Sequence, residues 1–315
     1  MRRLVLLATL LALPACARPT LPPVAPEVAG ATHRESTFAG HGDLALYTQS
    51  WRPAAPRAAL IVVHGLKDHS ANYVELAGRL TAEGFAVHAL DLRGHGRSPG
   101  ERSFVTSFAE HTGDLEKFVA HVRAAEPGLP IFLFGHSMGG AIATTYTLDH
   151  QDQVAGLVLS AAALQLDPKV SPGLVKLTRK LGAKHPTWRV LKLKPKHFSR
   201  DPAVVAAVRG GDPLVDAKKI PASTAAALID AIDRIQRDAP KLTVPLLILH
   251  GDADRITPPA GSRALHDRAA SRDKTLTLLP GFFHDLLHEP DHERVLVDIT
   301  RWLLTHASPT PSGGS

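Results

Sequence analysis

Short apolar runs alternate with longer segments of helical period along most of the chain, and this alternation limits the fold more than any other feature. Runs of this length are typical of buried strands, and the segments between them repeat apolar residues with the period of a helix. The pattern predicts an α/β protein whose mostly parallel sheet carries helices on both faces. The predicted strands cover 60–63, 86–90, 131–134, 154–159, 245–249 and 275–279, and the predicted helices cover 72–83, 108–125, 138–150, 259–270 and 291–306.

Two segments depart from this alternation. Residues 44–51 alternate apolar and polar, and the turn-forming H-G-D sequence at 41–43 precedes them, which predicts an initial hairpin. Between 160 and about 240 no buried strand run appears, and Pro, Lys and helix-period patterns replace it. We therefore expect a helical cap inserted into the sheet domain, which resumes at 245–249.

The N-terminal residues 1–16 resemble a bacterial lipoprotein signal. Two arginines precede the apolar run 4–13, which is too short to span a bilayer. The run leads to Cys16, the only cysteine of the chain, at the place where a lipid anchor would be attached. Cleavage after Ala17 and a buried core cysteine are the alternatives. We expect a protein of the bacterial cell envelope, lipid-anchored at the outer membrane or the periplasmic face, or else secreted.

The remaining end segments have compositions that cannot form a core. Residues 17–32 are rich in Pro and Ala and read as a tether, and 307–315 form a Ser/Pro/Gly tail. The folded domain is therefore expected at 33–306. Of the 315 residues, 44% are apolar and 21% charged, which suits one large domain with an inserted cap.

The predicted cap is strongly basic, although the net charge of the whole chain is only +6. That net charge is too small to indicate a nucleic-acid partner. No Asp or Glu interrupts the basic block, which is either a solvated face or a surface attracted to anionic lipid headgroups. Its members are Lys169, Lys176, Arg179, Lys180, Lys184, Arg189, Lys192, Lys194, Lys196 and Arg200.

The motif G-H-S-M-G at 135–139 carries the most specific chemical signal. It directly follows a predicted strand and directly precedes a predicted helix, which is the context of a nucleophile elbow centred on Ser137. Glycines around the serine permit a sharp, strained turn, and the N-terminus of the following helix favours a developing negative charge. Ser137 is therefore the predicted nucleophile.

A second G-x-S-x-G match, around Ser98, is not expected to be catalytic. The residue after the nucleophile must donate its backbone N–H to the oxyanion, and Pro99 has none. No helix follows this match either. We expect its loop to shape a wall of the site.

A serine needs a base to accept its proton and an acid to orient that base. The chain contains 18 histidines, so position must decide. In this strand order the acid follows the strand after the insertion and the histidine follows the last strand, which selects Asp254 and His284. Asp252 is the alternative acid but more plausibly holds the turn through local amides. His288 is the alternative base but falls on the helical side, where a surface or capping residue is expected.

The second oxyanion donor is expected directly after the first parallel strand. The N–H of Leu66, together with that of Met138, could bracket the oxyanion, and Gly65 permits a close backbone approach. His64 and His69 lie nearby, but no further ligand has a spacing that suits zinc. No phosphate-binding or dinucleotide motif is present, so no cofactor or metal is expected.

Five motifs in this order resemble those of the monoacylglycerol lipase and lysophospholipase family of α/β hydrolases. The motifs are HGLKDHS at 64–70, DLRGHGRS at 91–98, GHSMGG at 135–140, GDAD at 251–254 and HDLLHE at 284–289. The resemblance covers about 34–306. It implies the α/β-hydrolase fold, a mobile lid at 160–240 over an acyl channel, a triad of Ser137, Asp254 and His284, and oxyanion donors Leu66 and Met138.

Together these features predict a serine hydrolase that cleaves fatty-acid esters through an acyl-enzyme intermediate. The resemblance favours monoacylglycerols or lysophospholipids, with apolar cap stretches at 174–175 and 204–208 lining the acyl side. An aminopeptidase or short-chain esterase on the same scaffold is one alternative, and a non-catalytic lipid-binding lipoprotein is another. The expected partners are the lipid ester and a membrane surface, reached through the lipid anchor and the basic cap. Oligomeric state stays open.

Overall fold

The computed structural model describes residues 28–307. The predicted signal and Cys16 lie outside the described residues, as do most of the tether and all of the predicted tail except Ala307, which ends α8. Strand β1 begins at Ala31, so the folded domain starts two residues before the predicted boundary. No helix within 28–307 is long and apolar enough to cross a membrane.

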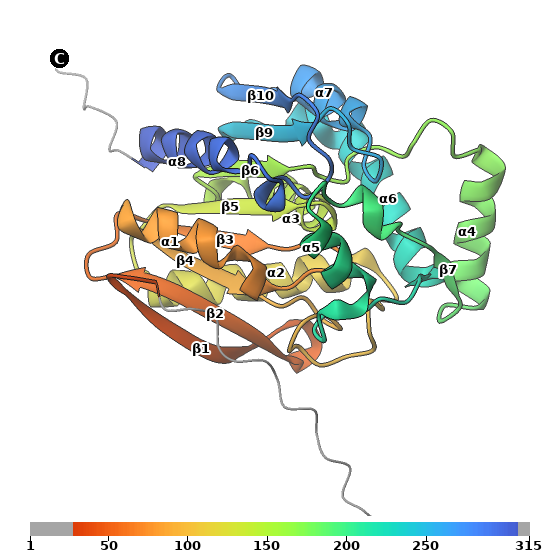
Figure 1. The fold of residues 1–315 in the computed structure, drawn as a ribbon, viewed down its shortest axis with the longest axis horizontal. Coiled ribbons are helices and arrows are strands. Elements are labelled where there is room, and N and C mark those ends of the chain that lie inside the picture. Colours follow the sequence, from red (N-terminus) through yellow and green to blue (C-terminus); the bar gives the residue numbers. More distant parts are fainter. Residues whose placement is uncertain (1–27, 308–315) are drawn as a thin grey trace, which may run out of the picture.

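The centre of the fold is a sheet of eight strands in the order β1-β2-β4-β3-β5-β6-β9-β10 (Figure 1). Strand β1 pairs antiparallel with β2, and β2 pairs antiparallel with β4, which gives the predicted initial hairpin. Every other pairing is parallel. The strands are β1 Ala31–Ala39, β2 Ala45–Pro53, β3 Ala58–Val63, β4 Phe85–Leu90, β5 Ile131–His136, β6 Gly156–Ser160, β9 Leu246–Gly251 and β10 Lys274–Leu279.

Helices cover both faces of this sheet, as the alternating pattern predicted. One apolar layer packs α1 and α8 against one face, and a second layer packs α2, α3, α6 and α7 against the other. Strands β3, β4, β5, β6 and β9 are buried along their whole length because they lie between these layers. The helices are α1 Val74–Ala82, α2 Phe108–Ala125, α3 Met138–Asp149, α6 Ala222–Asp238, α7 Pro259–Arg268 and α8 Glu293–Ala307.

An insertion separates β6 from β9 and lies beyond the carboxyl ends of the strands (Figure 1). Its last helix, α6, packs against α2 and α3 on one side and carries α4 on the other. Helix α6 therefore extends the core, and only the residues before it project from the domain. A small two-stranded sheet, which the sequence did not indicate, joins β7 (Arg189–Leu191) to β8 (Ile220–Pro221).

The projecting residues fall into two parts. We call residues 172–191 the outer cap, which contains α4 (Pro172–Lys184) and β7. We call residues 195–219 the inner cap, which contains α5 (Pro202–Ala206) and the irregular segments on either side of it. Figure 1 shows α4 standing away from the sheet, whereas α5 lies close to the ends of the central strands.

Candidate active site

Ser137 occupies the sharp turn between β5 and α3. Its backbone dihedrals are φ 54° and ψ −120°, a strained conformation for any residue other than glycine. Four backbone hydrogen bonds hold it. Its N–H donates to the carbonyl of Ser160 at 3.1 Å, and its carbonyl accepts from Gly140 at 3.0 Å, from Ala141 at 3.3 Å and from Ala163 at 2.9 Å. The turn is thus fixed from the neighbouring strand, from its own helix and from the start of the insertion.

The glycines of the motif permit the close packing of this turn. A Cβ atom on Gly139 would collide with the carbonyl oxygens of Val63 and His64, and one on Gly135 would lie 2.7 Å from the carbonyl of Gly139. Only glycine therefore allows β3, β5 and α3 to meet behind the serine.

The predicted base and acid lie within hydrogen-bond distance of the serine. His284 follows β10, and its Nε2 lies 2.8 Å from Ser137 Oγ. Its Nδ1 lies 2.7 Å from Oδ2 of Asp254, which follows β9. A carboxylate only accepts, so Nδ1 carries the hydrogen and Nε2 presents its lone pair to the serine hydroxyl. The three side chains thus form one buried row in the tautomer that general-base catalysis requires.

Asp254 is held by more donors than the histidine alone. Its Oδ1 accepts from the N–H groups of Ile256 and Thr257, and its Oδ2 accepts from the Thr257 hydroxyl at 2.8 Å. The Nε2 of His250 lies 3.2 Å from the same oxygen. Burial alone would raise the pKa of Asp254, but His284 and His250 lower it further than burial raises it. The carboxylate therefore stays charged and keeps one orientation.

Sequence reasoning missed His250 and Thr257 as members of this site. The pattern D-x-x-T was available as a signal, because an Asp often accepts from the N–H two or three residues ahead. His250 gave no such signal, since its contact with Asp254 depends on how the loop turns after β9.

The alternative acid and serine have other contacts. The side chain of Asp252 accepts from Gly281 N–H at 2.7 Å, so it ties the loop after β9 to the loop that carries His284. The Ser98 hydroxyl donates to the carbonyl of Asp91 at 2.5 Å and accepts from Tyr47 N–H at 2.9 Å. Both residues therefore hold loops of the site and lie outside the row.

The two predicted oxyanion donors flank Ser137. The N–H of Met138 begins α3, and neither it nor the N–H of Leu66 has a hydrogen-bond acceptor within 28–307. Space for this approach comes from Gly65, whose added Cβ would lie 2.9 Å from Ser137 Cβ. Both N–H groups are therefore available to an oxyanion beside the serine.

His64 orients the first of these donors. Its Nδ1 lies 2.8 Å from the carbonyl of Gly65, and its Nε2 accepts from Leu92 N–H at 3.0 Å. Burial lowers the pKa of His64, so the ring is neutral with its hydrogen on Nδ1. Because a trans peptide points its C=O and N–H in opposite directions, fixing the Gly65 carbonyl also fixes the direction of the Leu66 N–H.

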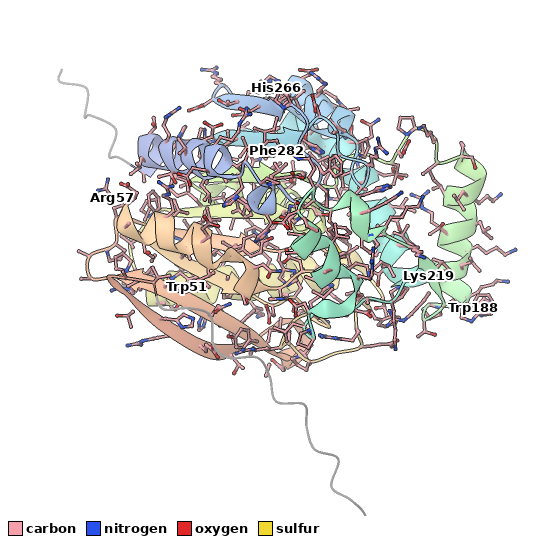
Figure 2. All side chains as sticks on the ribbon, viewed as in Figure 1. Trp51, Arg57, Trp188, Lys219, His266 and Phe282 are labelled. Carbon is pink, nitrogen blue, oxygen red and sulfur yellow. The ribbon has the colours of Figure 1, made fainter. Side chains whose placement is uncertain are left out.

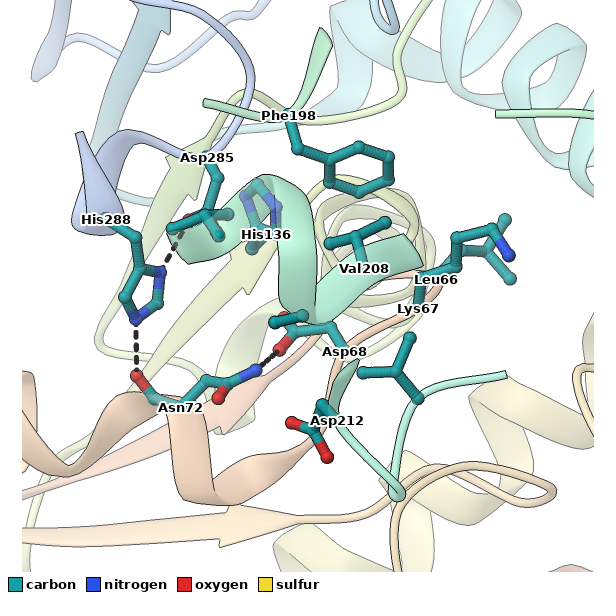
Figure 3. Close-up of a pocket in the computed structure, with 13 residues that line it drawn as sticks. Leu66, Lys67, Asp68, Asn72, His136, Phe198, Val208, Asp212, Asp285 and His288 are labelled. Atoms are coloured by element: carbon teal, nitrogen blue, oxygen red, sulfur yellow. Dashed lines mark hydrogen bonds and ion pairs between the residues drawn. The ribbon is translucent and has the colours of Figure 1, made fainter. Parts of the chain in front are cut away.

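A pocket that we call the polar pocket opens under the inner cap, between His136 and Phe198 (Figure 3). Leu66, a predicted oxyanion donor, and His136, which precedes Ser137, form part of its wall. Its apolar ceiling comes from Phe198, Val204 and Val208. The polar lining consists of Lys67, Asp68, Asn72, Asp212, Asp285 and His288.

His288 is not the surface or capping residue that the sequence suggested. Its Nδ1 donates to Asp285 Oδ1 at 2.8 Å and its Nε2 donates to the carbonyl of Asn72 at 2.9 Å, as Figure 3 shows. Burial lowers the pKa of His288, but the Asp285 carboxylate outweighs this and raises it to about 9. The ring is therefore a cation whose two N–H groups are both used inside the pocket wall.

His136 presents an acceptor to the same pocket. Its Nδ1 lies 3.1 Å from the carbonyl of Ser160, which only accepts, so this nitrogen carries the hydrogen. Burial and the neighbouring His284 lower the pKa of His136 to about 4, which leaves Nε2 as a lone pair. With the carboxylates of Asp68, Asp212 and Asp285, the pocket offers mainly acceptors to a ligand.

A second, apolar groove lies between α4 and α6. It has a volume of about 260 Å³ and is lined mainly by aliphatic side chains, among them Leu174, Leu177 and Ile232. The sequence analysis predicted that the stretches 174–175 and 204–208 both line the part of the site that holds the acyl chain. The structure separates them, since Leu174 lines the groove whereas Val204 and Val208 cover the polar pocket.

Fold and site together define a serine hydrolase of the α/β-hydrolase architecture. A family model described as serine aminopeptidase, S33, matches residues 54–291. A monoacylglycerol lipase from Mycolicibacterium smegmatis is 40% identical over 276 residues, which cover 87% of this chain and 98% of that protein. Human monoglyceride lipase is 35% identical over 263 residues, which cover 82% of this chain and 86% of that protein.

A solved structure agrees with these relatives. The crystal structure of Paleococcus ferrophilus monoacylglycerol lipase superposes with a TM-score of 0.75 at 34% identity and covers 83% of this chain and 99% of that chain. The chain therefore belongs to the monoacylglycerol lipase family of α/β hydrolases, as its motifs predicted. Membership also confirms the prediction of a carboxylic ester hydrolase.

Proposed function

We propose that the protein hydrolyses monoacylglycerols, with Ser137 as nucleophile, His284 as general base and Asp254 as the group that orients the base. The observation that carries this proposal is the row of hydrogen bonds from Ser137 Oγ through His284 to Asp254, at 2.8 Å and 2.7 Å. The monoacylglycerol lipases among its relatives support the same substrate class.

Catalysis proceeds in two halves. Ser137 Oγ attacks the ester carbonyl while His284 Nε2 takes its proton, and the N–H groups of Leu66 and Met138 stabilise the oxyanion. His284 then returns the proton to the leaving alcohol, and the acyl group remains on the serine. A water molecule, activated by His284 in the same way, releases the fatty acid and restores the enzyme.

The polar pocket takes the alcohol half of the substrate. Glycerol carries hydroxyl groups that donate, and His136 together with the carboxylates of the wall supplies acceptors for them. A phosphate group would bring negative charge and further acceptors to the same wall. A phosphate would meet the carboxylates of Asp68 and Asp285, while the N–H groups of His288 and the ammonium of Lys67 are already bonded to protein acceptors. The pocket therefore favours a monoacylglycerol over a lysophospholipid.

The acyl half lies toward the apolar groove between α4 and α6. Each methylene buried there contributes about 0.8 kcal/mol, so binding strengthens with chain length until the groove is filled. A volume of about 260 Å³ lies just below the range of about 300–1,000 Å³ for ligand pockets. We therefore expect medium-length acyl chains to saturate the groove.

The outer cap approaches the lipid surface. Leu174, Leu177 and Trp188 are about half exposed on it, at 50%, 48% and 56%. Figure 2 shows Trp188 at the outer edge of the molecule, on the side of α4. Exposed lysines surround these apolar side chains, so the surface suits an anionic membrane, where each basic side chain adds about 1 kcal/mol.

A lipid on Cys16 would keep the enzyme at such a membrane. The signal-like segment 1–16 supports export and an anchor in the bacterial cell envelope. Mass spectrometry of the mature N-terminus, compared between wild type and Cys16→Ser, tests this. A diacylated cysteine is expected in the wild type, and an unmodified N-terminus on both proteins would contradict the anchor.

An aminopeptidase is the second candidate, because the matching family model carries that description and three carboxylates line the polar pocket. Two of these carboxylates are already paired with histidines, Asp212 with His69 and Asp285 with His288. These histidines offset the negative charge that a substrate ammonium would need, so the ester substrate is favoured.

Labelling and a substrate panel together test the proposal. A fluorophosphonate should add one label to the wild type and none to Ser137→Ala, as measured by intact mass. Monoacylglycerols should be hydrolysed faster than lysophosphatidate and amino-acid anilides, and Ser137→Ala should lower kcat by about 10⁴-fold or more. Labelling of a residue other than Ser137, or faster cleavage of anilides, would contradict the proposal, and a wild type without label would favour a lipid-binding protein.

A further inference from the structure

Lys67 directly follows the oxyanion donor Leu66 and reaches into the inner cap. Its side chain is almost wholly buried, with 5% exposed. Its Nζ donates to the carbonyl of Asp216 at 2.6 Å and to the carbonyl of Lys218 at 2.7 Å. Lys67 lines the polar pocket, but Figure 3 shows its side chain directed away from His136 and Asp285, and its ammonium bonds the cap carbonyls instead.

Burying this ammonium without a bonded carboxylate is unfavourable. Burial lowers the pKa of Lys67, the nearby Asp216 carboxylate raises it in part, and Arg189 lowers it again. The backbone of Lys67 is also in the left-handed region, at φ 60°, which a residue with a side chain seldom adopts. The buried ammonium and the left-handed backbone both cost stability, so we expect the contacts of Lys67 to have a functional role.

The cap loop that receives Lys67 is built around the Asp216 side chain. Its Oδ1 accepts from Lys218 N–H at 3.0 Å, and its Oδ2 accepts from Arg189 at 2.8 Å and from the Ser103 hydroxyl at 3.2 Å. These bonds curl the loop so that the carbonyls of Asp216 and Lys218 converge on the ammonium. Asp216 is therefore the residue that shapes the acceptor for Lys67.

Leu66 is consequently held from two sides. On its N-terminal side, His64 fixes the Gly65 carbonyl and so the direction of the Leu66 N–H. On its C-terminal side, Lys67 is fixed by carbonyls that belong to the inner cap. One support of the oxyanion donor thus comes from the sheet domain and the other from the cap.

We propose that Lys67 is a positioning residue that makes the oxyanion hole depend on how the inner cap is seated. When the cap loop 216–218 holds the ammonium, the Leu66 N–H points at the oxyanion. When that contact is lost, Leu66 rotates and the transition state loses one donor. The proposal rests on the proposed function, because it takes Leu66 as that donor.

Kinetics with a soluble short ester, p-nitrophenyl butyrate, distinguish a residue that positions the oxyanion donor from one that only tethers the cap. A donor that acts only in the transition state changes kcat, whereas a tether that only holds the cap over the substrate changes KM. Lys67→Gly removes the ammonium and suits φ 60°, so the variant is expected to fold. We expect its kcat to fall 10- to 100-fold with KM within twofold of wild type, and Lys67→Arg to recover most of the loss.

Asp216→Ala leaves Lys67 in place but disorders its acceptor. We expect kcat to fall about fivefold, and the double variant Lys67→Gly/Asp216→Ala to be no slower than Lys67→Gly alone, because both remove the same contact. Arg179→Met, which removes two exposed ion pairs of the outer cap, is the control with unchanged kcat.

Three outcomes would overturn the proposal: wild-type kcat in Lys67→Gly, a change confined to KM, or losses in the two single variants that multiply. A wild type that does not hydrolyse the ester, or a Ser137→Ala variant that does, would instead contradict the proposed function.

Discussion

The inner and outer caps belong to one insertion but are fastened to the protein in different ways. Inner-cap residues contact the loop that carries His284: the carbonyl of Phe198 accepts from Asp285 N–H at 2.7 Å, and the Ser199 hydroxyl donates to the His288 carbonyl at 2.9 Å. The Phe198 ring also packs edge-on against His284, with the ring centroids 5.7 Å apart.

Within the outer cap, Arg189 of β7 bonds Asp216 of the inner cap, but helix α4 has few such contacts. No residue of α4 is buried, and the helix rests on α6 through the apolar groove. Its ion pairs join Arg179 to Asp230 and Asp233, and all three side chains are substantially exposed. The comparison teaches that one insertion can combine a part tied to the loop that carries His284 with a helix that has no buried residue of its own.

Among the variants that test this comparison, the largest effect is expected for Glu289, which binds the inner cap. This buried carboxylate accepts from Phe283 N–H at 3.1 Å and from Arg200 Nε at 2.5 Å, so it joins the His284 loop to the inner cap. Glu289→Ala should lower the free energy of unfolding by about 3 kcal/mol and kcat by about tenfold, because Phe283 precedes His284. Urea denaturation and ester kinetics measure both.

Glu293→Ala is the matched control, since it removes an exposed carboxylate paired with Arg79 on the other side of the domain. A loss of less than about 1 kcal/mol is expected there. Equal losses of unfolding free energy in the two variants would show that the inner-cap contact stabilises the protein no more than an exposed ion pair does.

The second effect is a pH dependence of stability at His288. Asp285 raises its pKa to about 9, against burial, from an ordinary value of 6.5. The folded state therefore binds the proton more tightly than the unfolded state, and this stabilisation is full below about pH 6.5 and is lost as pH rises through about 9. His288→Gln should cost about 3 kcal/mol at about pH 6 and little above about pH 10.

Thermal or urea unfolding of both proteins across this pH range provides the measurement. A constant difference between wild type and His288→Gln would mean that the ring is neutral throughout, and would contradict the charged pocket wall.

The third effect should appear only at the membrane. Lys180→Gln with Lys184→Gln removes two exposed charges from α4 and should weaken binding to vesicles rich in anionic lipid about tenfold or more, at about 1 kcal/mol per lysine. Hydrolysis of a soluble short ester should not change. Lys117→Gln with Arg301→Gln removes the same charge from the body of the domain, and an equal loss of vesicle binding there would indicate a general charge effect.

The smallest effect is expected at Arg179. Its pairs with Asp230 and Asp233 are solvent-exposed, so Arg179→Met should change the free energy of unfolding by less than about 1 kcal/mol. A loss of about 3 kcal/mol, measured by urea denaturation, would remove the distinction between the two caps.

The sequence predicted those parts of the site that depend on local pattern and chain order. Ser137 lies between a strand run and a helix start, and Asp254 and His284 each follow a strand whose position in the order is readable. Parallel strands bring such loops to one edge of the sheet. The structure accordingly places the three side chains in hydrogen-bond contact.

The contacts that support these residues could not be predicted from the sequence. Lys67 binds a carbonyl 149 residues further along the chain, and a backbone carbonyl has no side-chain identity that a sequence could reveal. The stretch 204–208 is apolar, but its composition does not say which pocket it covers. Likewise, α6 reads as part of the cap, although its burial against α2 and α3 places it in the core.

The bonds at the Ser137 backbone have a consequence for inactivation by heat. Its amide and carbonyl join β6, α3 and the first residues of the insertion, so the turn cannot open unless all of these separate together. Local fraying of the outer cap would leave it intact. Loss of reactive serine on heating should therefore coincide with the cooperative melting of the whole sheet, while an enzyme with a loosened α4 still accepts small esters.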